Sequence, residues 1–169
     1  MSDRAEREDT IRVLHVDDQL DFAEMTTTFL ERESDRFDTE TVSSASEGLN
    51  RLAESTFDCV ISDYEMPGQN GVEFLRVVRE EWPDLPFILF TGKGSEIVAS
   101  DATSAGVTDY LQKSSGNEQY ELLANRILNA VGKVQAERQI KTEQNRFKAL
   151  FDHLSQPAVE VRYEADEPI

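Results

Sequence analysis

Residues 11–18 read IRVLHVDD, an apolar run that ends in two consecutive acids. Its length and composition are typical of a buried strand. Working outward, similar runs occur at 59–62 and 87–90, and they end in the polar residues Asp63 and Thr91. Runs that are apolar throughout are typical of central parallel strands, which are covered on both faces.

Strand-like runs alternate with stretches of helical spacing along the chain. The expected strands are 11–16, 37–42, 59–62, 87–90 and 107–111. The expected helices are 21–33, 46–54, 72–82, 95–105 and a long one from 117. Because parallel strands need crossover connections, this alternation predicts an α/β fold with helices on both faces of a parallel sheet.

Polar residues that follow four of the expected strands would meet at one edge of the sheet. They are Asp17, Asp18, Asp63, Thr91 and Lys113. Three close carboxylates cannot all stay ionised without a cation, and Mg²⁺ prefers such oxygen ligands. A carboxylate can also accept a phosphoryl group, which a lysine and a hydroxyl are suited to stabilise.

Five motifs in residues 11–131 resemble the receiver domain of two-component response regulators. They are VDD at 16–18, SDYEMPG at 62–68, NG at 70–71, TG at 91–92 and DYLQK at 109–113. The resemblance implies a flavodoxin-like (βα)5 doubly wound parallel sheet of strand order 2-1-3-4-5, here with an extended C-terminal helix.

The resemblance assigns Asp63 as the acceptor of a phosphoryl group from phosphohistidine. It assigns Asp17, Asp18, Asp63 and the backbone carbonyl of Glu65 to the cofactor, Mg²⁺ or Mn²⁺. The implied partner is a histidine kinase or a histidine phosphotransfer protein. The receiver would take up and lose its own phosphoryl group without acting as an enzyme on other substrates, although a longer protein carrying it could be a histidine kinase.

Other site residues follow from the same resemblance. Thr91 corresponds to the switch hydroxyl, Tyr110 to the switch aromatic and Lys113 to the phosphate-contacting lysine. Glu65 and Lys93 lie two residues beyond Asp63 and Thr91 and would tune the lifetime of the phosphoryl group. Their opposite charges suggest an ion pair that shields this group from water.

The residue after Lys113 departs from the family pattern, which has proline there with a cis bond. A cis bond before Ser114 would cost about 2.5–4 kcal/mol. We therefore expect a trans bond and a shifted loop over residues 113–116.

Three other residues have ordinary structural explanations. His15 is expected to be a packed histidine within the first strand. His153, in the segment FDHL at 151–154, lacks a kinase core after it. Cys59 is the single cysteine, so it cannot form an internal disulfide and is expected to be a small core residue in a reducing, cytoplasmic protein.

The chain carries 34 acidic against 17 basic residues, for a net charge of −17. Such a surface repels nucleic acid and anionic membranes, and no apolar run has the roughly 18 residues of a membrane span. The acidity fits either a basic partner or adaptation to high salt, and we favour the second because the acids are spread over the whole chain. The segments GKGS at 92–95 and QKSSG at 112–116 are similar to the corresponding segments of haloarchaeal receivers.

The expected organisation is a disordered segment at 1–9, a receiver at 10–133, a helical linker at 134–150 and an incomplete PAS-like start at 151–169. The segment 158–163 looks like a strand, and residues 145–159 resemble the entry to a PAS sensor domain.

The linker is either a solvated helix or a dimerising signal helix. One apolar seam joins Ile127, Val131 and Val134, and a second, offset by two positions, joins Ala136, Ile140, Phe147 and Leu150. A homodimer could form through this helix or through the face made by the fourth helix, fifth strand and fifth helix.

We therefore expect a phosphoaccepting receiver that forms an N-terminal part of a larger receiver–PAS signalling protein or hybrid histidine kinase. Two alternatives are a receiver-like scaffold that is never phosphorylated and a Mg²⁺-dependent phosphohydrolase. The intact set of pocket residues argues against the scaffold, and the short loops argue against the phosphohydrolase.

Overall fold

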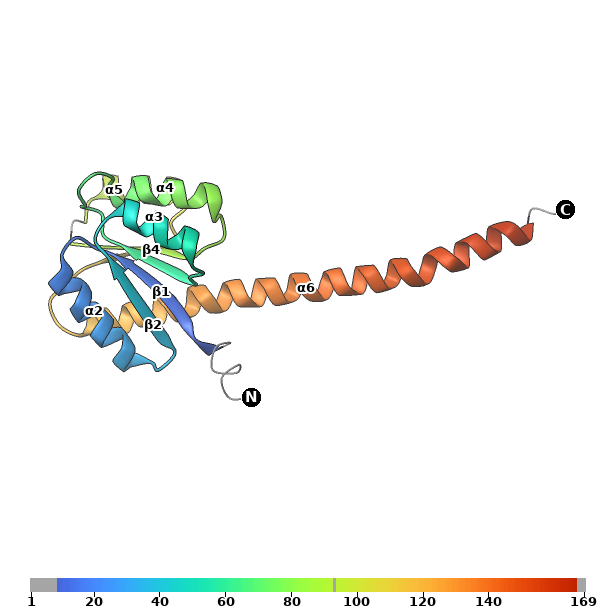
Figure 1. Cartoon of the computed structure of the whole chain (residues 1–169), viewed down its shortest axis with the longest axis horizontal. Helices are drawn as coiled ribbons and strands as arrows, with labels where there is room; N and C mark the ends of the chain where they lie inside the picture. Colours follow the sequence, from blue (N-terminus) through green and yellow to red (C-terminus); the bar gives the residue numbers. More distant parts are fainter. Residues whose placement is uncertain (1–8, 93, 167–169) are drawn as a thin grey trace. The chain divides into compact units, whose positions relative to one another are not determined.

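The computed structural model describes residues 9–92 and 94–166, with side chains described up to residue 154. Its five strands form one parallel sheet in the order β2-β1-β3-β4-β5 (Figure 1). The strands are β1 (Ile11–Val16), β2 (Phe37–Val42), β3 (Cys59–Ser62), β4 (Phe87–Thr91) and β5 (Asp109–Gln112). The predicted fold class and strand order are confirmed.

A helix follows each strand, as the alternation predicts. The helices are α2 (Leu20–Glu33), α3 (Ala45–Glu54), α4 (Gly71–Glu81), α5 (Glu96–Ser104) and α6 (Glu118–Asp166). Side chains at the N-caps fix three of these starts: Ser44, Asn70 and Ser95 each accept a backbone N–H of the first turn. The predicted helix starts, and the predicted ends of the first four helices, differ from these by at most one residue.

Alternate residues of the central strands enter two separate apolar layers. Leu14, Val60 and Leu89 pack with α3, α4 and α5 on one face of the sheet. Val13 and Ile61 pack with α2 and the first turns of α6 on the other face. Figure 1 shows α3, α4 and α5 on one side of the sheet and α2 with the start of α6 on the other. Burial on both faces explains why β3 and β4 are apolar along nearly their whole length.

The long helix α6 takes part in two compact units, 1–132 and 133–169. In the first unit Ile127 and Val131 are buried against the sheet, so most of the first apolar seam belongs to the core. In the second unit the other seam is exposed, with Ile140 at 55%, Phe147 at 70% and Leu150 at 57% of their full accessible area.

The expected strand at 158–163 is wrong, because α6 continues through this segment to Asp166. A helix satisfies its backbone hydrogen bonds internally, whereas a lone strand has no neighbour to pair with. The expected disordered segment lies outside the described residues except for Asp9. Among the described helices, none combines the length and apolar character needed to cross a membrane.

Candidate functional site

Two acids end neighbouring strands of the sheet and meet at its carboxyl edge. The backbone N–H of Asp17 donates to Val42 at 3.0 Å, and that of Asp63 donates to Val16 at 2.9 Å. Both residues therefore continue the hydrogen-bonded ladder just beyond β1 and β3. The ligand atoms of Asp17, Asp18 and Asp63 lie within 4.8 Å of one another, as the strand-end argument predicts.

Backbone donors orient the two buried carboxylates. Oδ1 of Asp17 accepts the N–H of Gln19 at 2.9 Å, and Oδ1 of Asp63 accepts the N–H of Tyr64 at 2.7 Å. Asp17 is fully buried and Asp63 is 6% exposed, whereas Asp18 is exposed to solvent. Asp17 therefore has two roles. It accepts a hydrogen bond from Gln19, the N-cap residue of α2, and it contributes a carboxylate to the acidic cluster.

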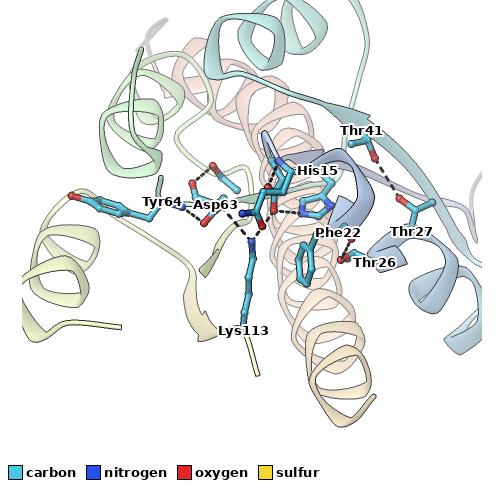
Figure 2. A network of polar contacts seen from close by, with 11 residues as sticks. His15, Phe22, Thr26, Thr27, Thr41, Asp63, Tyr64 and Lys113 are labelled. Atoms are coloured by element: carbon cyan, nitrogen blue, oxygen red, sulfur yellow. Dashed lines mark hydrogen bonds and ion pairs between the residues drawn. The ribbon is translucent and has the colours of Figure 1, made fainter. Parts of the chain in front are cut away.

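Lys113 supplies the positive charge between these acids. Its Nζ donates to Oδ2 of Asp17 at 2.9 Å. It also donates to Oδ2 of Asp63 at 3.3 Å (Figure 2). The Lys113 side chain is 13% exposed, so water screens these ion pairs less than it would at the surface. Two of the three carboxylates are therefore partly neutralised by the chain itself.

The loop after Lys113 keeps the trans geometry that the sequence predicts. The described part of the chain contains no cis peptide bond. The N–H of Ser114, which a proline would lack, donates to Oε1 of Gln119 at 3.0 Å, and Nε2 of Gln119 donates to Gly116 at 2.9 Å. The N–H of Lys113 also donates to the carbonyl of Thr91 at 2.8 Å. These hydrogen bonds hold the loop so that the Lys113 side chain reaches the acids, although Ser114 stands where the family pattern has proline.

Lys113 also contacts Phe22, a residue that none of the sequence motifs contains. Nζ of Lys113 lies 4.1 Å from the centroid of the Phe22 ring, which α2 carries (Figure 2). The helical periodicity predicts only that Phe22 faces the core. Which core-facing residue reaches Lys113 depends on the position of α2 over the sheet, which the sequence does not specify.

The loop from Asp63 to α4 needs a glycine at its end. A Cβ added to Gly71 would overlap the backbone oxygen of Asp63 and would lie 2.8 Å from Cδ1 of Leu89. The N–H of Gly71 donates to the carbonyl of Tyr64 at 2.8 Å, which closes the loop on itself. Asn70 and Glu73 then start α4 with a reciprocal capping box.

His15 is buried beside the acids and is neutral. Burial lowers the pKa of His15 to about 3, with the charge of Lys113 adding to this effect and Asp63 opposing it. Its Nε2 lies 3.8 Å from Oδ2 of Asp17, and neither ring nitrogen has a hydrogen-bond partner within the described residues. Cys59 is also buried, and burial raises the pKa of its thiol, as expected for an inert core residue.

Three other predicted site residues lie in β4, in β5 and in the loop after Asp63. Thr91 ends β4 and is 1% exposed, and Tyr110 in β5 is half-buried against the apolar layer formed with α3, α4 and α5. Glu65 is exposed. Lys93 lies outside the described residues, so its pairing with Glu65 stays a prediction.

The acidic cluster suits a hard divalent cation. All three side chains offer carboxylate oxygens, which Mg²⁺ and Mn²⁺ prefer, and their spacing allows one ion to contact them directly or through its waters. The exposed position of Asp18 leaves one side of the cluster open to such an ion.

Comparison with known proteins identifies the class. Residues 13–125 match the family model described as the response regulator receiver domain, and the chain therefore belongs to this family. A crystal structure of a receiver domain protein from Clostridium thermocellum superposes with a TM-score of 0.67 at 28% identity, covering 75% of this chain and 98% of that one.

Two curated response regulators are similar to part of this chain. The response regulator protein FleR of Pseudomonas aeruginosa is 42% identical over 72 residues, which is 43% of this chain and 15% of FleR. The DNA-binding response regulator MtrA of Mycolicibacterium paratuberculosis is 32% identical over 102 residues, which is 60% of this chain and 44% of MtrA. The similarity therefore spans less than half of either relative.

Proposed function

We propose that this chain is a phosphoaccepting receiver of a two-component phosphorelay, with Asp63 as the acceptor. The observation that carries the proposal is the meeting of Asp17, Asp18 and Asp63 within 4.8 Å of one another, with the ammonium of Lys113 bonded to Asp17 and Asp63. The donor partner is a protein that carries phosphohistidine, either a histidine kinase or a phosphotransfer protein.

The transfer forms one bond and breaks one. A carboxylate oxygen of Asp63 attacks phosphorus, a P–O bond forms, and the P–N bond to the donor imidazole breaks with its electron pair going to nitrogen. The imidazole then takes up a proton from water. Lys113, already 3.3 Å from Asp63, stabilises the negative charge on the phosphoryl oxygens.

Asp17, Asp18 and Asp63 would hold Mg²⁺ or Mn²⁺ together with the backbone carbonyl of Glu65. When bound, the ion neutralises charge on the phosphoryl oxygens and on the carboxylates. Asp17 and Asp63 are suited to this role because backbone N–H groups fix one oxygen of each.

The new dianion would draw the Thr91 hydroxyl inward and let Tyr110 follow. The face formed by α5, β5 and α6 would have two alternative packings, and such a local charge change would shift the equilibrium between them. Support comes from the position of Thr91, whose carbonyl already accepts the N–H of Lys113 at 2.8 Å. Glu65 and Lys93 would set how long the phosphoryl group survives.

The part of α6 beyond residue 132 would transmit the conformational change to an output module. This module would be a PAS-like domain in a longer protein, which could be a hybrid histidine kinase. Support comes from the exposed apolar side chains of Phe147, Leu150 and Leu154, which keep 57–70% of their full accessible area. Exposed apolar side chains that lie close together are typical of a surface that binds another protein or domain. A second copy of the chain is the competing occupant, and the mass of the protein in solution distinguishes the two. The net charge of −17 supports a cytoplasm of high salt.

One experiment tests the phosphoacceptor role. The protein is incubated with Mg²⁺ and a small phosphodonor such as acetyl phosphate, and its intact mass is measured beside that of Asp63→Asn. We expect one added phosphoryl group in the wild type and none in the variant. No adduct in the wild type would select the unphosphorylated scaffold, and continuous phosphate release without an adduct would select a phosphohydrolase.

A further inference from the structure

We propose that Phe22 is a positioning residue for Lys113, and that its ring holds the lysine ammonium in place for transfer to Asp63. The inference rests on the proposed phosphoacceptor function and adds a residue to it. It follows from one contact, the 4.1 Å between Nζ of Lys113 and the centroid of the Phe22 ring.

Three of the described residues attract the ammonium of Lys113. Two are carboxylates, Asp17 at 2.9 Å and Asp63 at 3.3 Å, and the third is the face of Phe22. Both carboxylates change during the reaction, since Asp63 becomes an acyl phosphate and Asp17 can be drawn to a metal ion. The aromatic face neither binds a hard cation as a ligand nor accepts a phosphoryl group, so it attracts the lysine throughout the cycle.

A lysine needs such a restraint more than most residues. Its four-carbon stem has many rotamers, and ordering it costs up to about 2 kcal/mol of conformational entropy. The backbone of Lys113 is fixed by its N–H bond to Thr91, but this bond leaves the side chain free to turn. The ring of Phe22 limits that freedom because the ammonium stays close to its face, and Figure 2 shows the ring beside the lysine.

The ring of Phe22 is itself held by neighbours. Its centroid lies 5.8 Å from that of Phe90 in β4 and 6.4 Å from that of Tyr120 in α6. Phe90 is fully buried and Tyr120 is 2% exposed, so neither partner can move far.

The competing explanation is that Phe22 only fills the core. Phe29 provides a matched control, because it lies on the same helix, packs on the same Tyr120 and carries its own cation, with the Arg32 guanidinium 5.7 Å from its centroid. If lost packing slows phosphorylation, substitutions at Phe22 and at Phe29 should both slow it. If the lost contact with Lys113 slows phosphorylation, only substitutions at Phe22 should do so.

The test compares Phe22→Leu, Phe22→Met, Phe22→Tyr and Phe29→Leu in the full chain. The first measurement is the NMR shift of the Lys113 ε-protons, which a ring face moves upfield, assigned with Lys113→Met. The second is the rate of phosphorylation by acetyl phosphate at saturating Mg²⁺. We expect Leu and Met at position 22 to abolish the upfield shift and to slow phosphorylation about three- to tenfold, the range of a partly desolvated cation–π contact.

Phe22→Tyr should retain both the shift and the rate, and Phe29→Leu should leave both unchanged even where its thermal stability falls as much as that of Phe22→Leu. In a Lys113→Met background, Phe22→Leu should have no further effect on the rate. A wild-type rate in both Phe22→Leu and Phe22→Met, an unchanged lysine shift, or equal slowing in Phe29→Leu overturns the positioning role. If the wild type itself takes up no phosphoryl group, the proposed function fails instead.

Discussion

The ammonium of Lys113 lies 2.9 Å from Oδ2 of Asp17, although 96 positions separate the two residues in the chain. Asp17 is fully buried, so its charge depends on a partner from the protein or from solution. A divalent cation held by the acidic cluster would therefore compete with Lys113 for the Asp17 carboxylate. This competition connects the metal affinity of the pocket to the position of the lysine.

Lys113→Met should bind Mg²⁺ more tightly and accept phosphoryl groups more slowly. Removing the ammonium frees Asp17 and Asp63 for the metal, and the affinity should rise by about fivefold or more, the scale of a typical coupling between two ligands. Charge on the transferring group would lose its nearest protein cation. Titration by fluorescence or calorimetry measures the affinity, and a weaker Mg²⁺ affinity in the variant would contradict the competition.

Gly71→Ala should destabilise the protein by about 1–3 kcal/mol, because the added Cβ meets the backbone of Asp63 and the side chain of Leu89. Gly132 in α6 is the matched control, since a Cβ there meets nothing within 4 Å. Gly132→Ala should stabilise its helix by about 0.5–1 kcal/mol. Urea unfolding measures both variants, and equal effects of the two substitutions would contradict this account of Gly71.

Glu40 should contribute stability that disappears in acid. Its hydrogen bonds from Arg51, at 2.6 and 3.0 Å, hold the pKa of the Glu40 carboxyl below its ordinary value of 4.5. A lowered pKa in the folded state gives stability that is present above pH 4.5 and lost as the pH falls through the folded value.

The effect of Glu40 is at most about 1 kcal/mol because both side chains are about one-third exposed. We expect Glu40→Gln to be less stable than the wild type at pH 7, with the difference shrinking below pH 4.5. Urea unfolding of the two proteins at several pH values is the measurement. A difference that grows in acid would have the wrong sign.

High salt should stabilise the protein. A net charge of −17 on 169 residues produces self-repulsion in the folded state, and mobile ions screen it. The melting temperature should therefore rise steadily from low to molar KCl and should rise less in a neutral solute of equal osmolality. A melting temperature that KCl lowers would contradict adaptation to salt.

The sequence predicted the acidic pocket because its geometry follows from a simple rule. Asp17 and Asp63 follow apolar runs, and parallel strands bring their carboxyl ends to one edge. The trans bond at Ser114 followed from the energy of peptide isomers. These predictions needed only the order of the elements and local chemistry.

Other features depend on packing that a linear pattern does not contain. The contact of Phe22 with Lys113 depends on how α2 is rotated and shifted over the sheet. The bond of Ser114 to Gln119 depends on where α6 begins. The segment 158–163 has strand-forming residues, but without a neighbouring strand it continues the helix.

The central claim is that Asp63, among three clustered acids, is the one that carries the phosphoryl group. Borohydride reduces an acyl phosphate to an alcohol, so trapping the phosphorylated protein converts the modified aspartate into homoserine, which peptide mass spectrometry locates. We predict homoserine at position 63 in the wild type, only after incubation with phosphodonor and Mg²⁺. Homoserine at position 17 or 18, with position 63 unchanged, would contradict the account.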